Sequence, residues 1–158
     1  LEHESRPRVL FLEGLKPLYG AGLWNPELVA LAGGRNLHGR AGAAPRKTML
    51  DHISVLDPDV IFVAANSLEY ASIRSTIDEL AEANSDWGVL RAVAHDRIFV
   101  AESDGHFNTP GPSMIDGLEL LAYTLHPHRY EKPAAAGDLL HVKRADSGLA
   151  HLTNPADD

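Results

Sequence analysis

The chain has 158 residues, a formal net charge of −8 and no cysteine. This length is usual for one globular domain, and an apolar share of 44% is sufficient for a folded core. The lack of cysteine excludes disulfides, cysteine-ligated zinc and thiol catalysis. The negative charge argues against a nucleic-acid partner, and no apolar run approaches the roughly 20 residues of a membrane-spanning helix.

Three short apolar runs are typical of buried strands. They are RVLFLE at residues 8–13, VIFVAA at 60–65 and RIFVAE at 97–102. Residues 14–24, which follow the first run, contain three glycines and a proline. We therefore expect a long loop there.

Helices are predicted between and after these runs. In the segment 25–34, Asn25 is the expected N-cap, Pro26 occupies the first helical position and glycines end the helix. The segment 48–59 reads as a second helix capped by Thr48. Further helices are expected over 68–83 and 113–125, with a short helical turn over 88–94.

The alternation of strands and helices predicts an α/β fold, a three-layer sandwich with a mainly parallel sheet. We expect residues 1–130 to form this domain. Residues 131–158 are rich in Ala, Asp, Gly and Lys and contain one weakly strand-like stretch, LLHV. They are expected to form a polar C-terminal extension.

Ligands of an open parallel sheet bind beyond the carboxyl ends of its strands. Three predicted loops leave those ends here, and we call the surface they form the strand-end rim. The loops carry Tyr19 and Trp24, then Asn66, Ser67 and Glu69, and then His106, Phe107 and Asn108. Aromatic rings mixed with amides suit a large, flat and partly polar ligand, although each ring could instead cover the edge of the core.

The last of these loops, DGHFNTPGP at 104–112, is predicted to be stiff. Pro110 and Pro112 fix φ, and Gly111 allows the bend between them. A stiff loop would present Phe107 to a ligand with little loss of entropy. The helix that starts near Pro112 would direct its N-terminus at an anionic or acceptor group of that ligand.

No catalytic or metal site is predicted. The chain has no G-x-S-x-G elbow and no Walker loop, and Asn25 replaces the third glycine of a dinucleotide fingerprint. Asp104 and His106 form the best acid–base pair, but no nucleophile or oxyanion site accompanies them. His126 and His128 lack a nearby carboxylate in the sequence, which favours a structural or solvent-exposed role over metal binding.

Three stretches follow one another along the chain: RVLFLEGLKPLYGAGLWNPELVALAGGRNL, TMLDHISVLDPDVIFVA and VAHDRIFVAESDGHFNTPGPSMIDGLELLAYTLHP. In this order they resemble the C-terminal lobe of cobalamin- and siderophore-type substrate-binding proteins of ABC importers, whose two lobes are joined by one rigid helix. The resemblance covers about residues 7–130. It implies a single lobe of a two-lobe periplasmic binding protein, without enzymatic activity or a cofactor of its own.

The resemblance also implies a ligand, a partner and a location. The ligand would be cobalamin, another corrinoid or an iron chelate, and the partner would be an ABC permease. The protein itself would lie in the periplasm or elsewhere outside the cytoplasm. The implied ligand contacts are Tyr19, Trp24, Asn66, His106, Phe107 and Asn108. Pro45 falls near a position where the family often offers another aromatic ring.

Asp51 falls where the family carries a surface acid, usually Glu, that pairs with an arginine of the permease. The resemblance therefore implies that Asp51 docks the permease. A second reading is that this acid complements the dipole at the start of its helix.

One lobe supplies only one side of a cleft, and no second α/β unit precedes Arg8 in this sequence. Three functions stay open. The first is ligand binding for import, as a lobe of a larger protein. The second is a stand-alone interaction module that forms a homodimer through the strand-end rim, because three aromatic rings on one surface would expose a large apolar area. The third is an enzyme that uses Asp104 and His106.

Overall fold

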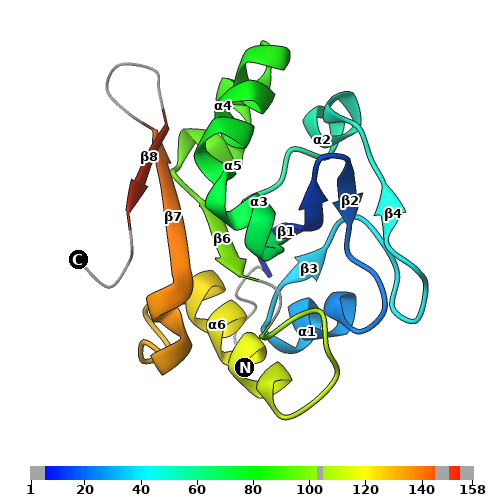
Figure 1. The fold of residues 1–158 in the computed structure, drawn as a ribbon, viewed down its shortest axis with the longest axis vertical. Coiled ribbons are helices and arrows are strands. Elements are labelled where there is room, and N and C mark those ends of the chain that lie inside the picture. The colour runs from blue at the N-terminus through cyan, green and yellow to red at the C-terminus, as the bar shows by residue number, and fades with distance from the viewer. Residues whose placement is uncertain (1–5, 103–104, 145–149, 154–158) are drawn as a thin grey trace.

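The computed structural model describes residues 6–102, 105–144 and 150–153. These residues contain one eight-stranded sheet with the order β4-β2-β1-β5-β6-β7-β8, and β3 pairs with the start of β1 (Figure 1). The strands are β1 (Arg8–Leu15), β2 (Leu18–Gly20), β3 (Arg35–Asn36), β4 (Arg46–Lys47), β5 (Val60–Ala65), β6 (Ile98–Glu102), β7 (Leu139–Arg144) and β8 (Ala150–Thr153).

The three central strands are parallel, which confirms the prediction from the apolar runs. Val9 of β1 pairs with Val60 of β5, and Ile61 of β5 pairs with Ile98 of β6. Every residue of β5 is buried, as expected for a strand that is covered on both faces.

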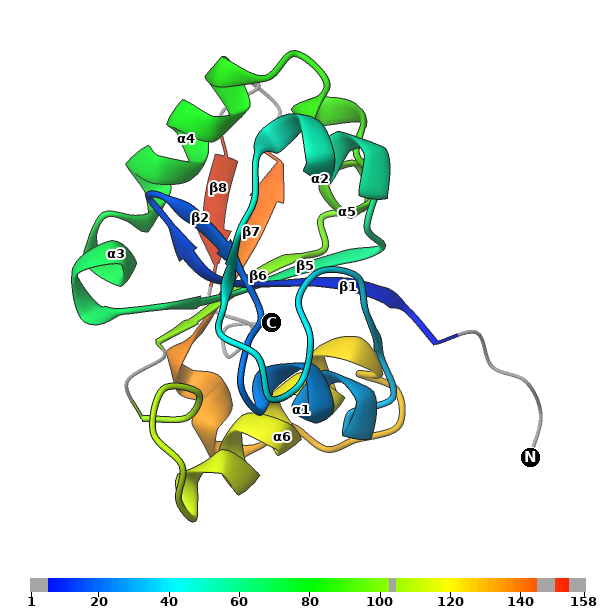
Figure 2. The same ribbon diagram turned by 90° about the vertical axis from the view of Figure 1, so that its right-hand side faces the viewer.

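Helices cover both faces of the sheet, so the predicted three-layer α/β sandwich is confirmed. Figure 2 shows α1 and α6 on one side of the central strands and α2, α4 and α5 on the other. The helices are α1 (Asn25–Leu31), α2 (Leu50–Leu56), α3 (Ser67–Ala71), α4 (Ile73–Ala83), α5 (Arg91–Ala94) and α6 (Ser113–Leu125), with 3-10 turns η1 (Trp87–Val89) and η2 (Ala134–Asp138).

The alternation of side chains along β1 divides the core in two. Val9 and Phe11 belong to the cluster under α1 and α6, whereas Leu10 and Leu12 belong to the cluster under α2 and α4. Successive residues of a strand point to opposite faces, so one short run serves both layers.

Both predicted N-caps are wrong. Trp24 occupies the N-cap position of α1, and Asn25 lies buried inside the helix with its side chain used elsewhere. Met49 occupies the N-cap position of α2, and the buried Thr48 hydroxyl makes no hydrogen bond within the described part of the chain. In each case the observed N-cap lies one residue from the predicted one, within the usual variation of helix ends.

The predicted long loop over 14–24 is largely a β-hairpin. β1 continues to Leu15, and β2 returns antiparallel to it, with Leu15 opposite Leu18. β2 pairs in turn with β4, so this hairpin widens the sheet beyond β1. The glycines that suggested a loop allow close packing instead, since a Cβ on Gly20 would lie 2.2 Å from the ring of His38.

The sheet also includes part of residues 131–158, the segment predicted to form a polar extension. The LLHV stretch lies in β7, which pairs antiparallel with β6, and β8 pairs antiparallel with β7. Leu139 and Val142 are buried in the core. The outer strands therefore make the whole sheet mixed, around its parallel centre.

Candidate functional site

The strand-end rim consists of three features that follow the carboxyl ends of neighbouring strands. They are the turn of the β1–β2 hairpin, helix α3 after β5, and residues 105–112 after β6. These features face the reader in Figure 1 and lie together along the left edge of Figure 2. The topology thus brings the three predicted loops to one edge of the sheet.

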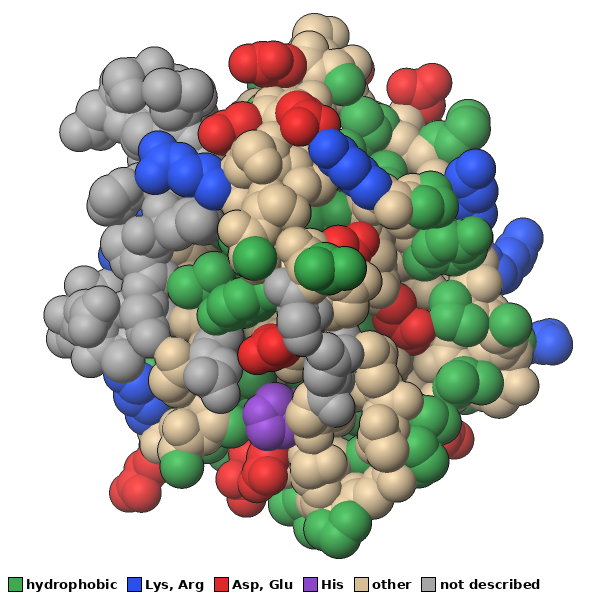
Figure 3. Space-filling view, viewed as in Figure 1, with side chains coloured by type: hydrophobic (Ala, Val, Ile, Leu, Met, Phe, Trp, Pro, Cys, Tyr) green, Lys and Arg blue, Asp and Glu red, His purple; other side chains and the backbone are tan. Residues whose placement is uncertain are grey.

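Tyr19 is the exposed aromatic ring of this rim. It lies in β2 between the buried Leu18 and Gly20, so its side chain points away from the core and is 37% exposed. Leu23 and Met49 are further exposed apolar residues on the segments around β2 and β4. Figure 3 shows hydrophobic side chains gathered on the right-hand side of the molecule, where β2 and β4 lie in Figure 1.

Phe107 does not face the rim, and the expectation of three aromatic rings on a common surface is therefore wrong. Its side chain is only 1% exposed. Its ring packs edge-on against Phe11 and Phe62, each 5.5 Å away between centroids. Gly117 of α6 permits this arrangement, because a Cβ there would lie 2.8 Å from the carbonyl oxygen of His106.

Trp24 is half-buried and acts as a brace for the loop that carries Phe107. Its indole Nε1 donates a hydrogen bond of 3.0 Å to the carbonyl of Phe107. The Asn25 amide donates to the same carbonyl at 3.5 Å and to Glu13 at 2.9 Å. Glu13 also accepts a 2.7 Å hydrogen bond from the backbone of Gly22. This network joins β1, the start of α1 and residues 105–112.

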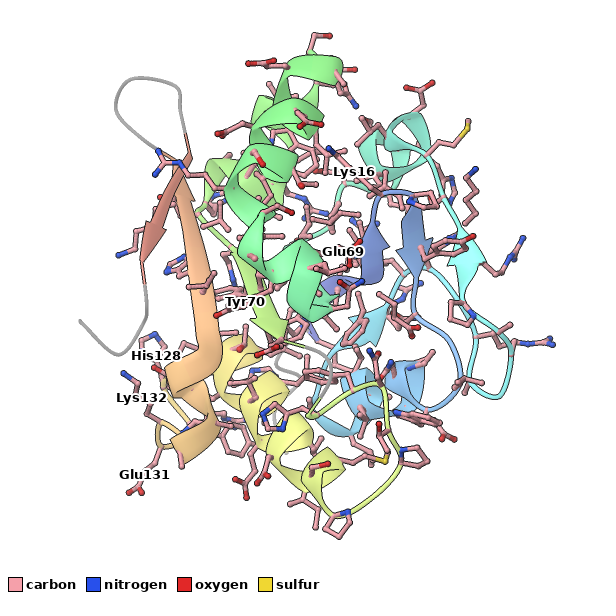
Figure 4. The ribbon with its side chains drawn as sticks, in the orientation of Figure 1. Lys16, Glu69, Tyr70, His128, Glu131 and Lys132 are labelled. Carbon is pink, nitrogen blue, oxygen red and sulfur yellow. The ribbon has the colours of Figure 1, made fainter. Side chains whose placement is uncertain are left out.

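Asn66 and Glu69 fix α3 against the hairpin. The Asn66 side chain accepts hydrogen bonds from the backbone of Leu68 and Glu69, and Glu69 completes a capping box. The other carboxylate oxygen of Glu69 accepts a 3.1 Å hydrogen bond from the backbone of Leu15 in the hairpin. Figure 4 shows Glu69 on α3 beside the hairpin turn that carries Lys16.

His106 is half-buried at the rim, and its Nδ1 finds no hydrogen-bond partner among the described residues. Asn108 is exposed on the same loop. Asp104 lies outside the described residues, so the geometry of the Asp104–His106 pair is not part of the structure. The predicted contact residues at accessible positions are thus Tyr19, Asn66, His106 and Asn108. The Asn66 side chain also caps α3, while Trp24 is half-buried.

The other residues singled out in the sequence lie on elements outside the rim. Asp51 is exposed in the first turn of α2, as expected. His128 is exposed on the segment after α6, far from the labelled rim residues in Figure 4. Within residues 6–102, 105–144 and 150–153, no three His, Asp or Glu side chains are arranged to hold a metal ion, and no helix could span a membrane.

Glu13 is the site residue that the sequence pattern missed. It ends the apolar run RVLFLE and lies half-buried within β1, and a carboxylate in a buried apolar strand is a signal that could have indicated a structural hydrogen-bond acceptor. Its partners Gly22 and Asn25 could not be inferred, because they depend on how the residues between Glu13 and Asn25 fold back.

No family model and no curated protein matches the chain. Solved structures do. A periplasmic heme-binding protein from Pseudomonas aeruginosa is 26% identical with a TM-score of 0.67, and the match covers 86% of this chain and 48% of that one. A periplasmic vitamin B12-binding protein of Vibrio cholerae is 21% identical with a TM-score of 0.60, covering 82% and 48%. An ABC transporter substrate-binding protein from Listeria monocytogenes is 22% identical with a TM-score of 0.64, covering 79% and 49%.

The chain spans about half the length of these structures. It has the fold of one lobe of a periplasmic binding protein of ABC importers. The resemblance found in the sequence is thereby confirmed at the level of the fold, and the three structures named are all described as binding proteins.

Proposed function

We propose that this chain is a non-catalytic lobe of an extracytoplasmic substrate-binding protein of an ABC importer. The observation that carries the proposal is the match of most of this chain to half of several such proteins. In an open α/β sheet the ligand belongs beyond the carboxyl ends of the strands, where the strand-end rim lies. The rim would thus form one wall of a ligand cleft.

We infer that the ligand is a metal tetrapyrrole, either a corrinoid or heme. The exposed ring of Tyr19 offers a flat apolar surface, and the rim around it carries the imidazole of His106 and the amide of Asn108. Such a surface complements a flat macrocycle with polar substituents. The names of two structural neighbours, which bind heme and vitamin B12, support the same class.

The test is a titration of the chain with cyanocobalamin and, separately, with hemin, followed by absorbance. We expect Tyr19→Ala to weaken binding by about threefold to tenfold, because aromatic stacking contributes roughly 0.5–1.5 kcal/mol. Tyr19→Phe keeps the ring and should keep most of the affinity.

Tyr130→Ala is the matched control, since Tyr130 is 48% exposed and lies after α6, away from the rim. This variant should bind as the wild type does. Absence of saturable binding of both compounds would contradict the tetrapyrrole assignment, and equal losses in Tyr19→Ala and Tyr130→Ala would contradict the role of the rim.

Asp51 is our candidate for contact with the permease. Its carboxylate is exposed at the start of α2, on an element separate from the three that build the rim. A permease arginine could therefore reach it without displacing a ligand. The homodimer through the rim loses its basis, because Phe107 is buried and Trp24 half-buried.

A further inference from the structure

A hollow of about 750 Å³ lies at the edge of the sheet opposite the strand-end rim. Arg8 starts β1, Asp59 directly precedes β5 and Arg97 directly precedes β6, so the hollow sits at the amino ends of the three parallel strands. In Figure 2 this is the right-hand end of β1, whereas the rim is at the left.

The hollow is basic although the protein is acidic. Its wall contains Arg6, Arg8, Arg91 and Arg97 but one carboxylate, that of Asp59. Four of the 14 lysines and arginines of a chain with net charge −8 thus meet in one concave place. Such a concentration attracts anions even where the molecule as a whole repels them.

Two of these arginines are already neutralised or fixed. Arg91 binds the carboxylates of Asp57 and Asp59, each at 2.9 Å. The Arg8 guanidinium donates to the carbonyls of Leu56 and Asp57 at 2.7 and 3.1 Å. The remaining oxygen of Asp59 accepts the backbone N–H of Arg8 at 2.8 Å. Asp59 is therefore fully engaged with its neighbours.

The other two arginines have no carboxylate within ion-pair distance in the described part of the chain. Arg97 makes one long hydrogen bond, 3.4 Å to the carbonyl of Leu125, and Arg6 is exposed. Burial lowers the pKa of Arg97, an effect that the charge of Asp59 offsets in part. A partly desolvated cation without a bound counter-charge is costly to the fold, and an anion beside it would remove that cost.

We propose that this hollow binds a phosphate-type oxyanion between Arg97 and Arg6, with His126 in the adjoining wall. Guanidinium groups suit this ligand because their N–H groups match two oxygens of a phosphate at once. The phosphate could be free or could be the headgroup of a phospholipid, and the same two arginines would recognise either. The site is separate from the strand-end rim and does not depend on the function proposed for that surface.

The test is calorimetric titration of the chain with inorganic phosphate at low ionic strength, with sodium chloride of equal ionic strength as the reference. We expect saturable binding that Arg6→Gln/Arg97→Gln weakens at least about tenfold, since both lost contacts are charge-assisted hydrogen bonds. Sedimentation with phosphatidylglycerol vesicles, compared with phosphatidylcholine vesicles, tests the lipid source. Binding of inorganic phosphate or of phosphatidylglycerol vesicles that depends on the two arginines supports the site. The arm in which binding occurs shows whether the phosphate is free or part of a lipid.

Arg40→Gln/Arg74→Gln is the matched control. It removes the same charge from two exposed positions, one in the loop before β4 and one on α4. It should bind phosphate as the wild type does. Circular dichroism checks that each variant is folded. If Arg6→Gln/Arg97→Gln does not fold, the single variant Arg6→Gln, at an exposed position, replaces it in the titration. No binding in either arm, or equal losses in the two double variants, would overturn the proposal.

Discussion

Glu69 is the residue on which the geometry of the rim most depends. One of its carboxylate oxygens accepts from the hairpin backbone at Leu15, and the other accepts from Asn66 at the start of α3. The hairpin carries Tyr19, so this half-buried side chain ties the exposed ring to the helix beside it. The carboxylate that caps α3 therefore also joins this helix to the hairpin, 54 residues earlier in the chain.

Glu69→Ala should lower the free energy of unfolding by about 1–3 kcal/mol, because it leaves backbone donors of the hairpin without an acceptor. Thermal unfolding followed by calorimetry measures this as a decrease in Tm of several degrees. Glu82→Ala, an exposed acid on α4, is the control and should change Tm very little. Equal effects of the two substitutions would mean that Glu69 acts only through net charge.

At the scale of elements, the described part of the segment after residue 130 is more than a polar tail. β7 adds a strand to the parallel centre, with Val100 of β6 opposite Leu140 and Ala101 opposite Leu139. Leu139 is fully buried, in the same cluster as Phe11 and Phe62. The boundary at residue 130 stays a prediction, but the core extends beyond it.

Leu139→Ala should destabilise the protein by about 2–5 kcal/mol, the usual cost of a cavity at a fully buried leucine. Denaturant unfolding measures this loss. Leu68→Ala on α3 is the control, since that leucine is 84% exposed and should contribute less than about 0.5 kcal/mol. A change at Leu139 as small as that at Leu68 would show that β7 is not part of the cooperative fold.

The sequence predicted best those elements whose signal is local. The runs at 8–13, 60–65 and 97–102 have at least four consecutive apolar residues each, and the helix over 113–125 is found over those residues. β2 and β4 were missed because each has only two or three residues and depends on pairing with distant segments. Phe107 was misplaced because Gly and Pro around it indicate a turn, but not whether the turn directs its ring inward.

At the scale of the whole molecule, Asp57 connects elements that lie far apart in sequence. Its carboxylate binds the backbone and side chain of Arg91 at the start of α5, each at 2.9 Å, and its carbonyl accepts from Arg8 of β1. The backbone hydrogen bond from Arg91, followed by the side-chain hydrogen bond and the charge of the same residue, holds the pKa of Asp57 below its usual value, although partial burial opposes this.

This shift predicts how stability changes in acid. A carboxylate whose pKa is lower in the folded state stabilises the fold above its unfolded pKa of about 4, and the contribution is lost as pH falls through the folded pKa. Asp57→Asn should therefore be less stable than the wild type at pH 7, and the difference should shrink below about pH 4. The group is partly exposed, so we expect no more than about 1 kcal/mol.

Urea unfolding at pH 7 and at pH 3 checks this prediction. Asn is tolerated better than most residues at the left-handed φ of 41° that Asp57 adopts, so the backbone is preserved. Asp86→Asn, at an exposed position before η1, provides the control and should show a smaller dependence on pH. A constant difference at both pH values would contradict the assignment to the carboxylate charge.

The inward position of Phe107 bears on how fast a ligand could enter and leave. Residues 105–112 cannot swing aside unless that ring leaves its place between Phe11 and Phe62 and the carbonyl beside it leaves the Trp24 indole. Displacing a fully buried phenylalanine costs several kcal/mol, so this segment is a fixed wall and not a movable gate. If the chain is a ligand-binding lobe as proposed, association with it should proceed in one step at a rate set by diffusional encounter, and any slow phase would have to arise outside this lobe.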